Sequence, residues 1–124
     1  MEYALDILNV SHIIICGHSH CGACESLYKD IPEQNTFIKK WLEIAKPVKD
    51  FTLRDKLIYP NREELYRATE KNSVIFQLKN LMTYPQVKER VENETLKIHG
   101  WYYNLLDGSL LVFQKETNSF ESVD

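Results

Sequence analysis

Two different spacings of apolar residues follow one another along this chain, and they are the first guide to its fold. In five stretches apolar residues recur every three or four positions, which predicts amphipathic helices. The predicted helices span residues 2–10, 21–30, 35–51, 62–82 and 85–93. Three prolines bear on these helices. Pro32 should end the second helix, Pro47 should disturb the third, and Pro85 suits the first turn of the last.

Short β-branched and aromatic runs predict the strands. Residues 12–16, "HIIIC", read as a buried strand, and residues 96–116 hold two strand-like segments on either side of Asp107-Gly108. An Asp-Gly pair between such segments is typical of a hairpin. The order of helix, strand, several helices and two strands predicts an α/β fold. Its early strand should be buried and parallel, and an antiparallel strand should lie at the far edge.

Composition narrows the functional classes. A length of 124 residues with 44% hydrophobic content fits one domain, residues 1–124. The net charge is −3 with both signs interleaved, which argues against nucleic acid as a partner. No apolar run approaches the roughly 20 residues of a membrane span, and the first residues lack a basic signal-peptide region. Three clustered cysteines suit a reducing cytosol better than a secreted disulfide framework, so a cytoplasmic protein is expected.

The stretch "HIIICGHSHCGAC", residues 12–24, gathers all three cysteines. His18 and Cys21 are three residues apart where strand should give way to helix, so both side chains could meet at one metal ion. Amides at a helix N-terminus would favour the Cys21 thiolate, and Zn²⁺ accepts sulfur and imidazole nitrogen together. H-x-x-C is nevertheless a short pattern that also occurs by chance. In the alternative structural interpretation, Cys16 and Cys21 are small buried residues and His18 is hydrogen-bonded in the turn.

A second functional interpretation concerns Cys21 and Cys24. C-x-x-C at a helix start after a strand is how thioredoxin-like oxidoreductases lower the pKa of a thiol. The several helices that follow here do not suit that fold, and Cys24 is expected to be a packed helix residue. The other histidines are expected to be solvated or hydrogen-bonded, not metal ligands; these are His12, His20 and His99.

Three separated stretches together resemble the β-class carbonic anhydrases: "HIIICGHSHCGAC", "VIFQLKNLMTYPQV" and "LKIHGWYYNLLDGSL". The resemblance implies a mostly parallel sheet with an antiparallel edge strand, flanked by helices. It also implies that His18 and Cys21 are zinc ligands, and that Gly17 and Gly22 beside them let backbone approach the metal and the substrate closely. The reaction implied is reversible hydration of CO2 to bicarbonate.

The family pattern also contains an upstream C-x-D-S-R motif, which supplies another zinc-binding cysteine and an Asp–Arg pair at the fourth position. These 124 residues hold no such motif, so the chain resembles a truncated, C-terminal portion of the family fold, and no catalytic residue can be assigned. Two matched ligands are one fewer than a catalytic zinc site usually has. Cys16 is a poor substitute, because a cysteine at that place is not a ligand in the family.

The missing part has consequences for assembly and activity. In the family fold the strand at residues 12–16 lies beside a strand that this chain lacks, so its backbone should be left at an apolar edge. Association into homo-oligomers, or with a partner that supplies the missing part, is expected, together with weak or no activity of the chain alone. The alternative function is that of a non-catalytic fragment that docks on a full-length relative.

Overall fold

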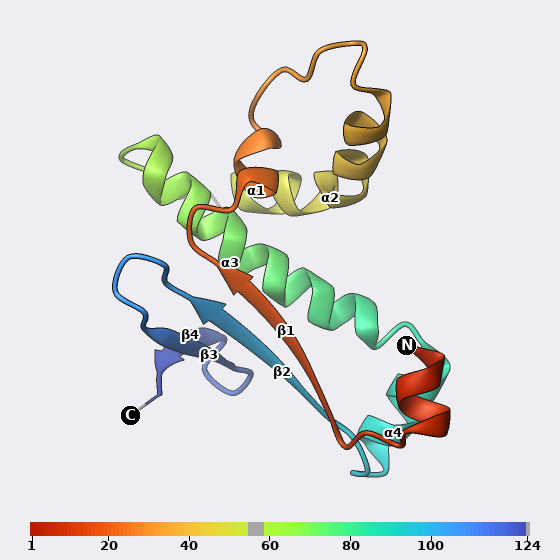
Figure 1. The fold of residues 1–124 in the computed structure, drawn as a ribbon. Helices are drawn as coiled ribbons and strands as arrows, with labels where there is room; N and C mark the ends of the chain where they lie inside the picture. The colour runs from red at the N-terminus through yellow and green to blue at the C-terminus, as the bar shows by residue number, and fades with distance from the viewer. Residues whose placement is uncertain (55–58, 124) are drawn as a thin grey trace.

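The computed structural model describes residues 1–54 and 59–123, and Figure 1 shows their arrangement. The chain begins with a π-helical turn, η1 (Tyr3–Ile7), and strand β1 (His12–His18). The helices that follow are α1 (Gly22–Ser26), α2 (Thr36–Arg54), α3 (Arg62–Leu81) and α4 (Pro85–Glu92). The chain then forms β2 (Lys97–Tyr103), β3 (Leu110–Gln114) and β4 (Ser119–Ser122). A mixed α/β fold is therefore confirmed, while the prediction of a single domain stays a prediction.

The sheet has four strands in the order β1-β2-β3-β4. β1 and β2 are parallel over their whole length, from His12 opposite Lys97 to His18 opposite Tyr103. The other two pairings, β2 with β3 and β3 with β4, are antiparallel. The prediction of a mostly parallel sheet is therefore wrong for the described residues, because only the first pairing spans a helical crossover. The predicted hairpin is confirmed: β2 and β3 are joined by a loop in which Gly108 has φ +73°.

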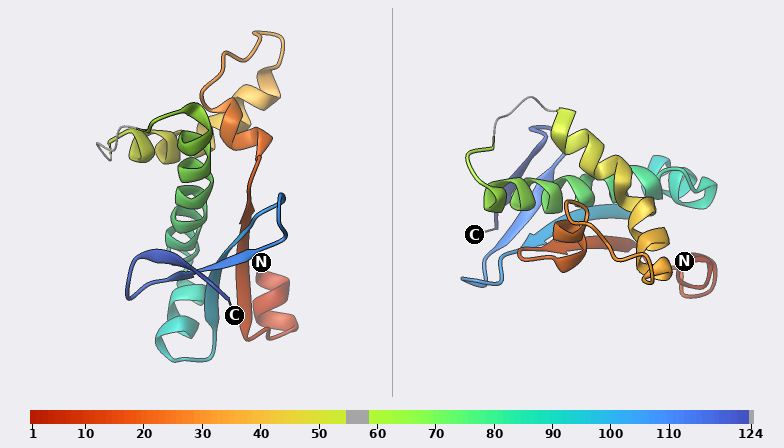
Figure 2. Two further views of the ribbon diagram at one scale, coloured as in Figure 1. Left: turned by 90° about the vertical axis from the view of Figure 1, so that its left-hand side faces the viewer. Right: turned by 90° about the horizontal axis from the view of Figure 1, so that it is seen from above.

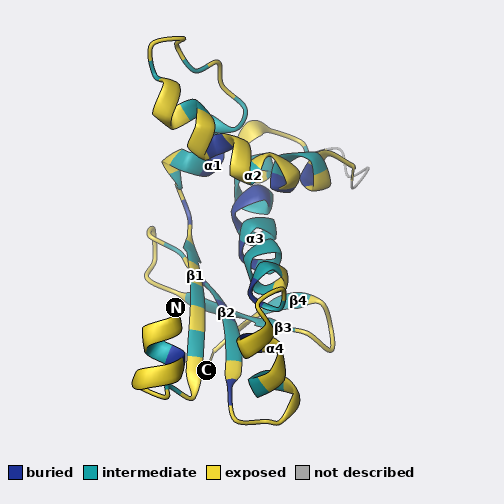
Figure 3. Ribbon diagram, turned by 90° about the vertical axis from the view of Figure 1, so that its right-hand side faces the viewer, coloured by how far each residue is buried: buried dark blue, intermediate teal, exposed yellow. Residues whose placement is uncertain are grey.

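The expectation that the early strand is buried is also wrong. β1 alternates between exposed and half-buried positions, as Figure 3 shows, and Ile14 is 44% exposed. Among the described residues β1 pairs only with β2, and α3 packs on one face of the two strands (Figure 2). The opposite face of β1 is therefore exposed to solvent. β1 is also the edge strand of the described sheet, so the apolar sheet edge expected from the sequence is confirmed.

Two glycines bring α3 close to the sheet. A Cβ at Gly17 on β1 would lie 2.6 Å from Cγ2 of Val74, and one at Gly100 on β2 would lie 2.8 Å from Cδ1 of Leu78. Both distances are shorter than any ordinary van der Waals contact, so a larger residue would force α3 away from the sheet. Val74, at the point of contact, is only 2% exposed. The absence of two side chains thus fixes the distance between the helix and the parallel strands.

The helices lie where they were predicted but differ in extent and form. The helix predicted for residues 2–10 is only the π-helical turn η1, Tyr3–Ile7. The helix predicted for residues 21–30 ends at Ser26, where hydrogen bonds change to tighter turns such as that from Leu27 N–H to the Cys24 carbonyl. α2 continues through Pro47, although its ribbon changes direction part-way along (Figure 1). Figure 1 shows α1 and α2 along one side of α3, with α4 and η1 near its C-terminal end. No helix in the described ranges is long and apolar enough to cross a membrane.

Candidate metal centre

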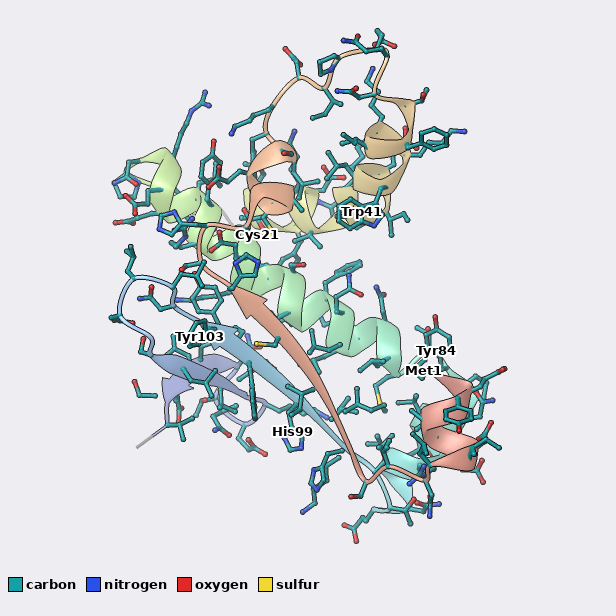
Figure 4. All side chains as sticks on the ribbon, in the orientation of Figure 1. Met1, Cys21, Trp41, Tyr84, His99 and Tyr103 are labelled. Carbon is teal, nitrogen blue, oxygen red and sulfur yellow. The ribbon has the colours of Figure 1, made fainter. Side chains whose placement is uncertain are left out.

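The two predicted ligands lie at the corner between β1 and α1. His18 is the last residue of β1, and Cys21 is the N-cap of α1 with extended backbone angles, φ −74° and ψ 110°. Figure 4 shows Cys21 at this corner, with Trp41 of α2 to one side. His20 turns the chain between them with a left-handed φ of 57°. The strand-to-helix junction predicted from the sequence is therefore confirmed.

A hydrogen bond fixes the tautomer of His18. Its Nδ1 lies 2.8 Å from the carbonyl oxygen of Ser19. A carbonyl only accepts hydrogen bonds, so in the neutral ring Nδ1 carries the proton and Nε2 keeps its lone pair. A backbone carbonyl on the second ring nitrogen is the usual arrangement for a metal-binding histidine. Nε2 of His18 is thus the atom available to a metal.

Ser19 anchors the corner to the loop after β2. Its backbone N–H donates to the carbonyl of Tyr103 at 2.9 Å, and its Oγ accepts from the N–H of Leu105 at 2.8 Å. The same hydroxyl donates to Oδ1 of Asn104 at 3.4 Å, and Ser19 is 2% exposed. These contacts immobilise Ser19, one of the two residues between the predicted ligands.

A buried glutamate holds Cys21 from the other side. Oε1 of Glu70, on α3, accepts the backbone N–H of Cys21 at 2.9 Å, although Glu70 is only 1% exposed. Arg67 donates from Nη2 to Oε1 at 3.0 Å, and its Nε lies 2.9 Å from Oε2. The hydroxyl of Tyr102 donates to Oε2 at 2.8 Å, and burial together with this bond raises the pKa of that phenol. A buried charge needs such a set of partners, so this network fixes α1 relative to α3.

The donor types at the corner match zinc, but their number does not complete a site. A thiol and an imidazole are both ligands that Zn²⁺ takes. The Ser19 carbonyl holds the imidazole of His18, and Glu70 holds the backbone N–H of Cys21. Within residues 1–54 and 59–123 no three His, Cys, Asp or Glu side chains come close enough together to hold a metal ion. His18 and Cys21 therefore fit as part of a zinc site, and the described residues supply no third ligand.

Comparison with known proteins now places the chain. The carbonic anhydrase family model matches residues 1–110. The solved structure of the β-carbonic anhydrase CcaA superposes with a TM-score of 0.90 at 33% identity, covering 100% of this chain and 56% of that one. This chain belongs to the β-class carbonic anhydrases. A tetrameric β-carbonic anhydrase of Sordaria macrospora superposes at 0.79 with 26% identity, over 90% of this chain and 56% of the other.

The sequence relatives give the same family and show how much of it is present. A carbonic anhydrase of Synechocystis is 34% identical over 97% of this chain, which corresponds to 44% of the relative. One from Helicobacter pylori strain J99 is 31% identical over 100% of this chain and 58% of its own length. The β-class chain described here thus spans about half the length of these relatives.

The two glycines predicted to lie beside the metal and the substrate, Gly17 and Gly22, have different surroundings. Gly17 faces α3, where the contact with Val74 explains why no side chain fits. A Cβ at Gly22 would meet nothing within 4 Å. The structure therefore gives Gly17 a packing role, and the predicted closeness of both glycines to a substrate stays a prediction.

Of the remaining cysteines and histidines, His20 lies in the corner itself and is exposed, whereas the others lie outside the corner or are buried. Cys24 is 8% exposed, and burial together with the neighbouring Cys21 raises the pKa of its thiol to about 12. Because thiol exchange starts from a thiolate, Cys24 is unsuited to be the attacking thiol of the alternative C-x-x-C chemistry. Cys16 is exposed on β1. His12 and His99 contact each other across β1 and β2, with Nδ1 and Nε2 2.9 Å apart.

Sequence reasoning missed Ser19 and Glu70. Glu70 could have been found, because it lies four positions before Val74 and thus on the buried stripe of α3, where an acidic residue requires a partner. The contacts of Ser19 could not have been found, because they depend on the loop after β2, 85 residues further along the chain.

Proposed function

We propose that this chain contributes part of the zinc site of a β-class carbonic anhydrase and acts in the reversible hydration of CO2 to bicarbonate. The observation that carries the proposal is the position of His18 and Cys21 at one corner, with the His18 ring bonded to the Ser19 carbonyl and the Cys21 backbone N–H bonded to Glu70. The family membership supplies the reaction, and the third ligand would come from a segment outside these 124 residues.

The chain's own residues would orient the ligands. The Ser19 carbonyl holds the His18 ring by Nδ1, so that Nε2 is presented to the metal without a change of tautomer. Glu70 fixes the backbone of Cys21, which aims the thiolate from the first turn of α1. Zinc, when bound, supplies the Lewis acidity that makes water a nucleophile near neutral pH. CO2 is small and apolar, so the site needs little further recognition machinery.

Zinc binding tests the ligand assignment directly. The purified chain is loaded with Zn²⁺ and its metal content measured, alone and after mixing with a polypeptide that carries a C-x-D-S-R segment. Cys21→Ser and His18→Gln should each reduce bound zinc at least tenfold, because they remove a ligand. Cys16→Ser is the matched control and should keep the wild-type content. Loss of zinc from the Cys16 variant, with retention by the Cys21 variant, would refute the assignment.

Activity is a separate measurement on the same samples. We expect CO2 hydration to be weak or absent for the chain alone and to appear when the complementing segment is added, because the segment completes the ligand set. A rate typical of a zinc enzyme from the isolated chain would contradict this part of the proposal.

We also propose that the chain associates with another polypeptide, either a second copy or a longer relative. Two features support this: the edge of β1, and a row of exposed apolar residues on α2. Phe37 is 88% exposed and Trp41 65%, and both lie on the same side of that helix. One relative is itself described as tetrameric. A stable monomer at all concentrations, measured by sedimentation, would refute the proposed association.

We further propose a cytoplasmic location, which suits three free cysteines.

A further inference from the structure

An apolar groove of about 1050 Å³ lies beside α3, away from the candidate metal centre. α3 lines one side with Ile75 and Leu78, together with its C-cap Met82, and the sheet lines the other with Ile98 of β2 and Phe113 of β3. Its volume is at the upper end of the range for small-molecule sites, about 300–1000 Å³. Figure 4 shows His99, which also lines the groove, on β2 at a distance from Cys21.

The groove floor is continuous with a packed core. Leu96 lines the groove and is 1% exposed, and it belongs to the buried cluster formed with Leu5, Leu81 and Val87. Met82 and Ile98 pack against the same cluster. Because the packed core supports this floor, it does not need to rearrange to accept a hydrocarbon tail. The entropic cost of binding is therefore lower.

The charges at the groove are mostly positive. Lys79, Lys97 and Lys115 line it together with a single carboxylate, Glu94. The groove thus has a local excess of positive charge, although the net charge of the whole chain is −3. The Lys79 ammonium lies 5.6 Å from the centre of the Phe51 ring, so one of the three is held at the side toward α2. An apolar floor with several ammonium groups is complementary to a molecule that has a hydrocarbon tail and one negative head group.

We infer that this groove binds long-chain carboxylates, with the hydrocarbon tail against α3 and β2 and the carboxylate near the lysines. Each methylene buried should strengthen binding about fourfold, the factor that corresponds to about 0.8 kcal/mol. Each exposed lysine that pairs with the head group should contribute about two- to fivefold. CO2 and bicarbonate have no tail, so this site is independent of the function proposed above.

Calorimetry with octanoate, decanoate and dodecanoate, below their micelle concentrations, tests the inference on the wild-type chain. Affinity should rise with tail length, and decan-1-ol should bind at least fivefold more weakly than decanoate. Lys97→Gln and Lys115→Gln should each weaken decanoate two- to fivefold. Lys40→Gln, the same charge change at an exposed position on α2 outside the groove, should leave it unchanged.

A fourth variant tests the floor: Met82→Gln keeps the side-chain length and should weaken decanoate about fivefold. Thermal unfolding of each variant shows whether it remains folded. Equal affinity for decan-1-ol and decanoate, or equal effects of the three lysine variants, would overturn the inference. So would a lack of binding by any carboxylate, or a dimer that buries the groove and is unaffected by decanoate.

Discussion

Replacing Glu70 by glutamine removes the one buried negative charge in the network behind Cys21. Glutamine keeps one acceptor oxygen, so the Cys21 N–H can stay bonded. The glutamine NH2 group then takes the place of Oε2, where it faces the donors of Tyr102 and Arg67. Tyr102 can rotate its hydroxyl to accept, whereas the Arg67 guanidinium has no acceptor to offer. The substitution therefore leaves a positive charge whose other ion pair among the described residues is with Glu25, 3.9 Å from Nη2.

The magnitude follows from these contacts. Removing one partner of a buried ion pair destabilises a protein by about 3–5 kcal/mol. The Arg67 side chain is 21% exposed and retains Glu25, so part of its charge stays compensated, and we expect about 2–4 kcal/mol. For a chain of this size that corresponds to a fall in Tm of roughly 10 °C.

Urea denaturation followed by circular dichroism measures the change in the free energy of unfolding. Glu92→Gln is the matched control: its ion pair with Lys88 is 3.9 Å long, both side chains are more than half exposed, and we expect less than about 0.5 kcal/mol. A double-mutant cycle with Tyr102→Phe should show a coupling of about 1 kcal/mol. If the Glu70 and Glu92 variants lost equal stability, the network would not be a buried charge cluster and the reasoning would be refuted.

Three further predictions use the same assay. Gly17→Ala should lose about 1–3 kcal/mol because its Cβ would meet Val74 at 2.6 Å, whereas Gly22→Ala should be nearly neutral; equal effects would contradict the packing role of Gly17. Leu96→Ala should lose about 2–5 kcal/mol, since Leu96 is 1% exposed; a loss below about 1 kcal/mol would show that the site tolerates the cavity. Burial raises the pKa of Tyr28, so above pH about 10 the unfolded chain loses this proton first and stability falls as pH rises. Tyr28→Phe should flatten that fall, and an unchanged pH profile would count against it.

The sequence anticipated the local structure well because its signals are local. The long helix α3 was visible in the spacing of Leu65, Ala68, Ile75 and Leu78, and the β2–β3 turn in Asp107-Gly108. Strand β4 was not predicted, because four residues of "SFES" carry too little pattern to distinguish them from a loop. The sheet was expected to be mostly parallel from the family resemblance, but pairing direction depends on which strands meet in space.

By itself the sequence indicated the family, and it predicted the two side chains of the candidate metal centre. A strand, a sharp turn and a helix start within "HIIICGHSHCGAC" are enough to bring His18 and Cys21 to one corner, since only two residues separate them. The tertiary structure decided what holds them there. Ser19 is tied to the loop after β2, and Cys21 to Glu70 on α3, 49 residues away. It also left one face of β1 exposed, where the sequence predicted a buried strand. Contacts between distant segments depend on packing and on pairing of strands, and a periodicity read along one segment does not contain them.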